Sequence, residues 1–180
     1  GLAANVDIVV GRSSGLLADL PDATGAVCVG HALYGISPFS DPTLTDAVLS
    51  PVLTEVGARI IHVAEHPREP GAGGYLVDGA SRVGVIPFGV TDGLRRPSPG
   101  GEPHALVRGR RVPVIGVSLE HTVLDLATVP DAAVGDRVLL VGSDGGERID
   151  PAMWAASSGC SELDAVVALA GRVERHTTDA

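Results

Sequence analysis

The sequence predicts a mainly β protein: a small antiparallel β-barrel preceded by a short βαβ-like leader and followed by one or two helices. Six or more short apolar segments after residue 52 are separated by glycine- and proline-rich turns, which is typical of a small barrel or sandwich. The first 35 residues instead alternate apolar runs with a loop and a short helix-like segment. Near the C-terminal end of the sequence, capping residues precede two helix-like segments.

The leader spans residues 1–35. Val6–Val10 and Gly25–Val29 are apolar runs of the buried-strand type. Between them lie a turn at Gly11–Gly15 and a segment too short for a stable helix. The order strand, loop, short helix and strand indicates the closing edge of an α/β barrel, and we expect residues 36–180 to form a separate β-domain.

The β-domain is expected to consist of strands joined by tight turns. Each segment is short, rich in branched apolar residues and bounded by Gly or Pro. The expected strands are Leu53–Ala64, Ser81–Phe88, His104–Val107, Arg111–Ile115, His121–Leu126 and Asp136–Val141. The expected turns are residues 70–74, 97–101, 108–110 and 142–146.

Two helices are expected after the last strand. The segment Ile149–Ser158 begins with Asp150, a favourable N-cap, and with Pro151 at the first helical position. The segment Ser161–Ala170 begins with hydroxyl and acidic residues that favour a helix N-terminus. We expect Gly171 to end the second helix.

Composition narrows the function classes. The net charge of −9 and the pI of about 5.0 argue against nucleic acid and anionic membranes as partners. No apolar run reaches the roughly 18 residues of a spanning helix, and no basic-then-apolar leader opens the sequence. Cys28 and Cys160 lack metal-like spacing, so a reduced, cytoplasmic setting is expected.

The remaining motifs have weaker functional interpretations. His62 and His66 lie near Glu65 and Glu69, but without an evident further ligand we expect a surface cluster and no metal. The segment Gly11–Gly15 fits the G-x-S-x-G elbow of serine hydrolases, yet only ten residues precede it. A strand-to-helix turn is favoured there. A remnant anion site at Ser13 and Ser14 is the alternative.

The segment Leu106–Gly142 reads LVRGRRVPVIGVSLEHTVLDLATVPDAAVGDRVLLVG. It resembles the carboxy-terminal β-domain of alanine racemase, which carries a V-R-G-[KR]-[RK]-x-P strand pair followed by V-D-L and V-G-D-x-V-x-L-x-G. Three other segments resemble the same family in the same order: His31–Gly35, Arg82–Arg96 and Arg172–Arg175. Four collinear matches imply that residues 36–180 are this β-domain and that residues 1–35 are a remnant of the preceding barrel.

The resemblance implies a pyridoxal-phosphate enzyme, but this sequence contains no lysine. All 13 of its Lys+Arg residues are arginines. A pyridoxal-phosphate racemase holds its cofactor as a Schiff base on a lysine amine. We therefore expect no cofactor in this chain, and pyridoxal phosphate only if a lysine-bearing barrel complements it.

The resemblance also carries functional positions over, and most of them have lost their chemistry. The family's catalytic tyrosine falls on Gly71 in a gapless count and on Tyr75 if four residues are deleted. The tyrosine of the family's G-Y-A-D-G becomes Val90, and its substrate-binding methionine and aspartate become Leu119 and Glu120. The barrel arginine becomes Cys28, the phosphate-binding tyrosine becomes Leu163, and the phosphate-binding serine and glycine match Ser13 and Gly30, with Ser14 beside them.

Three functions remain open. The sequence favours a non-catalytic association domain that forms a homodimer or pairs with a barrel-bearing chain. The first alternative is the C-terminal part of a pyridoxal-phosphate-dependent alanine or amino-acid racemase whose barrel is missing or on another chain. In that case the chain would be inactive alone and Tyr75 would be its candidate catalytic residue. The last alternative is a small-ligand or anion binder that uses the Ser13 loop.

Overall fold

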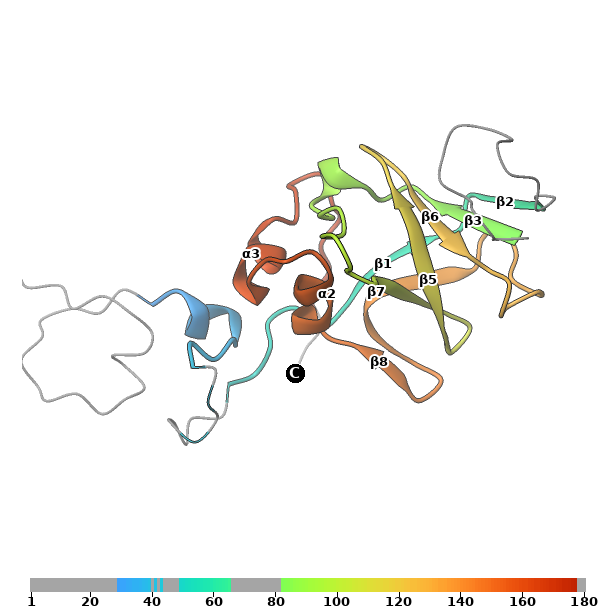
Figure 1. Cartoon of the computed structure of the whole chain (residues 1–180). Helices are drawn as coiled ribbons and strands as arrows, with labels where there is room; N and C mark the ends of the chain where they lie inside the picture. Colours follow the sequence, from blue (N-terminus) through green and yellow to red (C-terminus); the bar gives the residue numbers. More distant parts are fainter. Residues whose placement is uncertain (1–28, 40, 42, 44–48, 66–81, 178–180) are drawn as a thin grey trace, which may run out of the picture. The chain divides into compact units, whose positions relative to one another are not determined.

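A computed structural model of the chain describes residues 29–39, 41, 43, 49–65 and 82–177 (Figure 1). The chain divides into two compact units, residues 1–53 and 54–180. In the first unit, a 3-10 helix η1 (His31–Tyr34) ends at Gly35, whose φ of 70° lies in the left-handed region. The expected strand Val6–Val10, most of the expected strand Gly25–Val29 and the Gly11–Gly15 turn lie outside the described residues. The assignment of residues 1–35 to a barrel end remains a prediction.

The second unit is built on one antiparallel sheet, which confirms the mainly β fold class. Within the described residues it has eight strands, in the order β1-β7-β4-β5-β6-β3-β2, with β8 paired to β7. The strands are β1 (Val56–Arg59), β2 (His62–Glu65), β3 (Arg82–Ile86), β4 (His104–Val107), β5 (Arg110–Val117), β6 (Thr122–Asp125), β7 (Arg137–Asp144) and β8 (Glu147–Ile149).

The two edge strands β1 and β2 follow one another in the chain, separated only by Ile60 and Ile61. The Ile60 N–H donates to Asp136 O at 2.9 Å, on the β7 side, whereas the Ile61 N–H donates to Val85 O of β3 at 2.8 Å. The expectation of one strand over Leu53–Ala64 is therefore wrong. The chain bends at this point, so that β1 pairs with β7 near one end of the strand order and β2 pairs with β3 near the other end. Chain continuity, not hydrogen bonding between β1 and β2, joins the two edges.

Part of the core of this unit lies around β7, which pairs with three strands, β1, β4 and β8. Five consecutive residues of β7, Val138–Gly142, are buried, as expected for a strand covered on both faces. Leu139 packs with Leu106 of β4 and Ile149 of β8 in one buried cluster. Each such side chain contributes roughly 1.5–3 kcal/mol of transfer free energy.

The β4–β5 hairpin turns at Arg108 and Gly109, which confirms the turn expected at residues 108–110. Both residues have positive φ, 50° and 73°, as a two-residue hairpin turn requires. The Arg108 guanidinium is held by Asp136 (Nε to Oδ2, 2.7 Å) and Asp131 (Nη1 to Oδ2, 2.6 Å). The exposed charge of Arg108 is thus ion-paired.

Both expected helices are present, α2 (Pro151–Ser157) and α3 (Glu162–Val167), and they pack against each other beside the sheet (Figure 1). The Asp150 side chain accepts a hydrogen bond from the Met153 N–H at 2.8 Å, which confirms the predicted cap of α2. The second helix ends at Val167, earlier than expected, because the Ala170 N–H donates to Asp92 O at 3.0 Å instead of continuing the helix.

The expected turn at residues 142–146 is shorter than predicted. Strand β7 continues to Asp144, and the chain reverses at Gly145 and Gly146, whose φ values are 58° and 89°. Residues Glu147–Ile149 then form β8, a strand that the sequence did not predict.

Candidate functional site

Only three of the predicted site residues come together among the described residues. Val90 lies in the 3-10 turn η3 (Val90–Asp92), and Leu119 and Glu120 lie in the loop between β5 and β6. Gly30 is exposed in the first unit. Ser13, Ser14, Tyr75, Gly71 and Cys28 lie outside the described residues.

Backbone hydrogen bonds join η3 to the β5–β6 loop. The Val90 N–H donates to Ser118 O at 3.1 Å, and the Thr91 N–H donates to Leu119 O at 2.8 Å. The Thr91 hydroxyl donates to the same Leu119 carbonyl at 2.9 Å. The loop itself is closed by Ser118 and His121, because the Ser118 N–H donates to His121 O at 2.8 Å and the His121 N–H donates to Ser118 Oγ at 3.0 Å.

Two glycines let η3 fit between its neighbours. A Cβ on Gly89 would lie 2.6 Å from Leu119 O, closer than any side chain allows. Gly93 has a φ of 108°, and a Cβ there would lie 2.4 Å from Ala168 O. The turn is therefore held tightly by the β5–β6 loop on one side and by the chain after α3 on the other.

Asp92 is a buried carboxylate at the centre of this junction, with a residue exposure of 5%. Arg172 binds it through two atoms, Nε to Oδ1 at 2.6 Å and Nη2 to Oδ2 at 3.2 Å, and the Gly89 N–H donates to Oδ2 at 2.8 Å. Burial opposes ionisation of Asp92, but the hydrogen bonds from Arg172 and Gly89 outweigh it and lower its pKa. The same pair raises the pKa of Arg172.

The three predicted positions offer little chemistry. Val90 is half-buried and Leu119 is 60% exposed, and neither side chain carries a proton donor or acceptor. The Glu120 carboxylate is exposed, with its Oε1 3.8 Å from Arg172 Nη1. What the junction does chemically is to keep one buried charge paired and to fix the positions of two apolar side chains.

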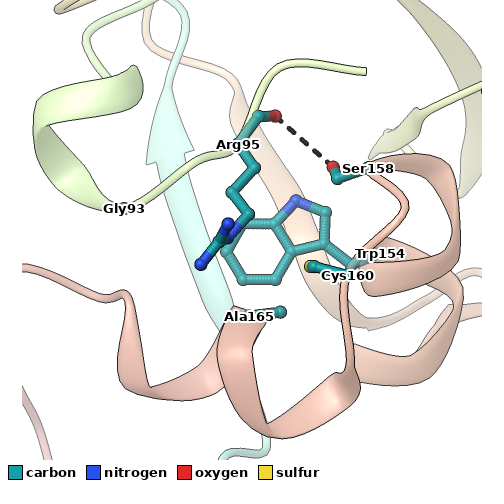
Figure 2. Close-up of a pocket in the computed structure, with 6 residues that line it drawn as sticks. All are labelled: Gly93, Arg95, Trp154, Ser158, Cys160 and Ala165. Atoms are coloured by element: carbon teal, nitrogen blue, oxygen red, sulfur yellow. Dashed lines mark hydrogen bonds between the residues drawn. The ribbon is translucent and has the colours of Figure 1, made fainter. Parts of the chain in front are cut away.

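A shallow recess lies next to the junction, between Gly93, Arg95 and the helices (Figure 2). Figure 2 shows the Arg95 side chain running along the Trp154 ring, with Cys160 and Ala165 beneath it. Its cavity volume is about 0 Å³, whereas most ligand sites enclose roughly 300–1,000 Å³, so the recess has no room for a bound molecule. The Trp154 side chain is buried, with an exposure of 6%.

Residues 53–177 match the family described as alanine racemase, C-terminal domain. The chain belongs to this family. The alanine racemase of Laribacter hongkongensis is 36% identical to it over 155 residues, which are 84% of this chain and 42% of that enzyme. The alanine racemase of Thiobacillus denitrificans is 36% identical over 166 residues, which are 89% of this chain and 44% of that protein.

Solved alanine racemases share the fold. The structure of the E. faecalis enzyme matches with a TM-score of 0.74 and 25% identity over 92% of this chain and 44% of its own. The biosynthetic enzyme of Pseudomonas aeruginosa matches with a TM-score of 0.68 and 27% identity over 87% and 43%. The resemblance read from the sequence is thus confirmed. The chain spans less than half the length of these relatives.

The residues of this chain do not fit pyridoxal phosphate. The sequence has no lysine to form the aldimine. At the described positions that the family resemblance assigns to cofactor and substrate, Val90, Leu119 and the half-buried Leu163 of α3 carry no polar side-chain atom. Within the described part of the chain, no group of three or more His, Cys, Asp and Glu side chains is arranged to hold a metal ion, but His66 and Glu69 lie outside that part.

Sequence reasoning missed Asp92 and Arg172 as partners. Both lie in segments that carried the family resemblance, Arg82–Arg96 and Arg172–Arg175, but they are 80 positions apart in the chain. The sequence near Asp92 gives no signal that its carboxylate is buried, nor that its ion-pair partner is Arg172.

Across the described residues, none of the helices has the length and apolar character that a membrane span requires.

Proposed function

We propose that this chain is a non-catalytic association domain of the alanine racemase C-terminal family, which forms a homodimer or pairs with a barrel-bearing chain in the cytoplasm. The proposal rests on the junction between η3 and the β5–β6 loop. The residues that hold its backbone in place are present, but Val90 and Leu119 are apolar at positions where the family resemblance places polar or substrate-binding side chains. Gly89, Asp92 and Arg172 hold η3 in place, while no lysine is present anywhere in the sequence.

Loss of chemistry at the junction supports the non-catalytic part of the proposal. General acid–base catalysis needs a side chain that can exchange a proton within hydrogen-bond reach of the substrate. Val90 and Leu119 cannot do so, and the pKa of Asp92 is lowered by a bidentate arginine, which keeps this carboxylate ionised and occupied. Glu120 keeps a carboxylate, but it is 62% exposed and lies 3.8 Å from Arg172, so the junction mainly positions backbone and apolar surface.

Exposed apolar side chains support the association part. Val52 (65%) and Ile61 (46%) are exposed within residues 36–65, and Met153 (44%) and Val167 (52%) are exposed on the helices. These two regions, residues 36–65 and the helices α2 and α3, are the interface that we propose. Removing such groups from water favours association by about 25 cal/mol per Å² of apolar area.

Sedimentation velocity over a wide concentration range tests the association. We expect the full chain to sediment as a dimer at high concentration and Val167→Glu to weaken that dimer, because a carboxylate would be buried in the interface. Val134→Glu is the matched control, since Val134 is 62% exposed but lies outside both regions. A wild-type monomer at every concentration, with no complex formed with a barrel-bearing chain, would refute the proposal.

A second candidate is the C-terminal part of an alanine racemase-like enzyme, with the cofactor on a barrel that this sequence does not include. It is favoured by the coverage, because the chain spans only 42–44% of the relatives that match it. In that case Tyr75 is the phenol that this chain would supply. The test is α-carbon deuterium exchange of alanine by the complex reconstituted with a lysine-bearing barrel, comparing wild type with Tyr75→Phe. Fast exchange that Tyr75→Phe abolishes would establish this second candidate.

A further inference from the structure

The segment Glu162–Val173, here called the C-terminal segment, is attached to η3 by both the backbone and the side chain of Asp92. The Arg172 guanidinium binds the two carboxylate oxygens, and the Ala170 N–H donates to the Asp92 carbonyl at 3.0 Å. Gly93 adds close backbone packing, since a Cβ there would lie 2.4 Å from Ala168 O. Residues 168–172 are thus held at three successive points.

The C-terminal segment in turn covers Trp154. Ala165 of α3 lies beside the indole in the recess of Figure 2, and α3 packs on α2, which carries Trp154. With six residues, α3 is too short to be stable without tertiary contacts. Its position therefore depends on what anchors the chain on either side of it.

We propose that the Asp92–Arg172 pair is a clasp that holds the C-terminal segment over Trp154, and that opening the clasp releases this segment while the sheet stays folded. The clasp is a conformational device within one chain, and it goes beyond the proposed association and does not depend on it. Two properties of the pair suit this role. Arg172 has an exposed side chain (49%), so it can leave, whereas Asp92 lies on a turn that the β5–β6 loop holds in place.

Acid is the condition that opens the clasp. The titratable or charged groups that face Asp92 are Arg172 from the C-terminal segment and Glu120 and His121 from the β5–β6 loop. Because the folded-state pKa of Asp92 is lowered, its carboxylate stabilises the closed form above the unfolded value of about 3.9. This stabilising contribution is lost as the pH falls through the folded-state pKa of Asp92, which is lower than the unfolded value. The clasp is therefore closed at neutral pH.

The test compares Arg172→Gln, Arg172→Lys and the matched control Glu120→Gln. Glu120 is the second carboxylate beside Arg172, but it is 62% exposed and 3.8 Å away. Hydrogen exchange is measured at the Ala170 amide and at the sheet amides of Leu106 and Leu139. Emission of Trp154, the one tryptophan in the sequence, reports its exposure.

We expect Arg172→Gln to speed exchange at Ala170 by at least about tenfold and to shift Trp154 emission to the red, with Leu106 and Leu139 unchanged. Arg172→Lys should be intermediate, since an ammonium keeps the charge but not the two-atom contact. Glu120→Gln should match wild type. In wild type, acid below about pH 4 should shift the emission before the sheet loses protection. In Asp92→Asn the shift should already be present at neutral pH.

Two results would overturn the clasp. One is an unchanged Ala170 amide and unchanged Trp154 emission in Arg172→Gln. The other is equal loss of protection at Ala170, Leu106 and Leu139, because the segment and the sheet would then unfold as one unit. Both readouts are taken below and above the concentration at which the chain associates. If the Trp154 emission changes with protein concentration but is the same in wild type and in the Arg172 variants, the change comes from association and the clasp is refuted.

Discussion

At the scale of single residues, the junction is governed by how close two backbones approach. Gly89 and Leu119 touch through main-chain atoms, so no side-chain rotation can relieve an added methyl group at Gly89. Asp92 depends on Arg172 for charge compensation, because an uncompensated buried carboxylate is strongly unfavourable. These residues hold Val90 and Leu119 in place without performing chemistry themselves.

We expect Gly89→Ala to destabilise the domain by about 1–3 kcal/mol, since its Cβ would lie 2.6 Å from a backbone oxygen. Gly116→Ala is the matched control, because its Cβ would meet Val123 Cβ at 3.7 Å, an ordinary contact. Urea unfolding of both variants gives the two free energies. If Gly89→Ala and Gly116→Ala have equal free energies of unfolding, the β5–β6 loop can move to accommodate the added methyl group, which would contradict the close backbone packing at Gly89.

The residue scale also shows what sequence could and could not predict of the site. The family resemblance assigned Val90, Leu119 and Glu120 to substrate-side positions, and backbone hydrogen bonds join the turn that carries Val90 to the loop that carries the other two. It did not identify Asp92 as buried, because burial depends on Arg172, 80 positions away. Tyr75, Ser13 and Ser14 stay predictions.

At the scale of elements, features set by residues close in sequence were predicted correctly, whereas the change of strand partner within residues 53–64 was not. The helix α2 was predicted with its cap because Asp150 and Pro151 act within one turn. Strand β4 was predicted with its observed bounds, since turn residues flank it. The bend at Ile60 and Ile61 was missed because it is imposed by partners at Val85 and Asp136. A continuous strand-like stretch such as residues 53–64 carries no local signal of a change in partner.

We expect Asp150→Ala to lower the free energy of unfolding by about 1 kcal/mol, because the Met153 N–H would lose its side-chain acceptor. Asp150→Asn should retain most of the stability, since the amide oxygen can still accept. Thermal unfolding followed by circular dichroism measures both. If Asp150→Asn loses as much stability as Asp150→Ala, the negative charge of Asp150 stabilises α2, and its hydrogen bond to the Met153 N–H does not.

The β4–β5 hairpin should show a pH dependence that comes from Asp136. Hydrogen bonds from Arg108 and from the Ala133 N–H lower the pKa of Asp136. A depressed folded pKa stabilises the protein above the unfolded value of about 3.9, and the contribution is lost as the pH falls through the folded value. The stability difference between wild type and Asp136→Asn should therefore be largest near neutral pH and shrink below about pH 4. A difference that is independent of pH would exclude this carboxylate as the source.

At the scale of the whole molecule, the chain keeps the β-domain scaffold of its family, and the proposed function is that this scaffold serves association without catalysis. The sheet order, the junction and the match to residues 53–177 place the chain in the alanine racemase C-terminal family. The sequence has 13 arginines and no lysine, which is why we propose that the chain binds no cofactor of its own. Association therefore stays the proposed function.

The most direct measurement is the mass of the full chain after incubation with pyridoxal phosphate, borohydride reduction and desalting, with peptide mapping of any adduct. A chain that holds no cofactor predicts no adduct beyond the α-amine and no retained chromophore before reduction. Addition of a lysine-bearing barrel should leave this chain unlabelled, with any adduct on the barrel. A stoichiometric, reduction-dependent adduct on an internal residue of this chain would contradict the account.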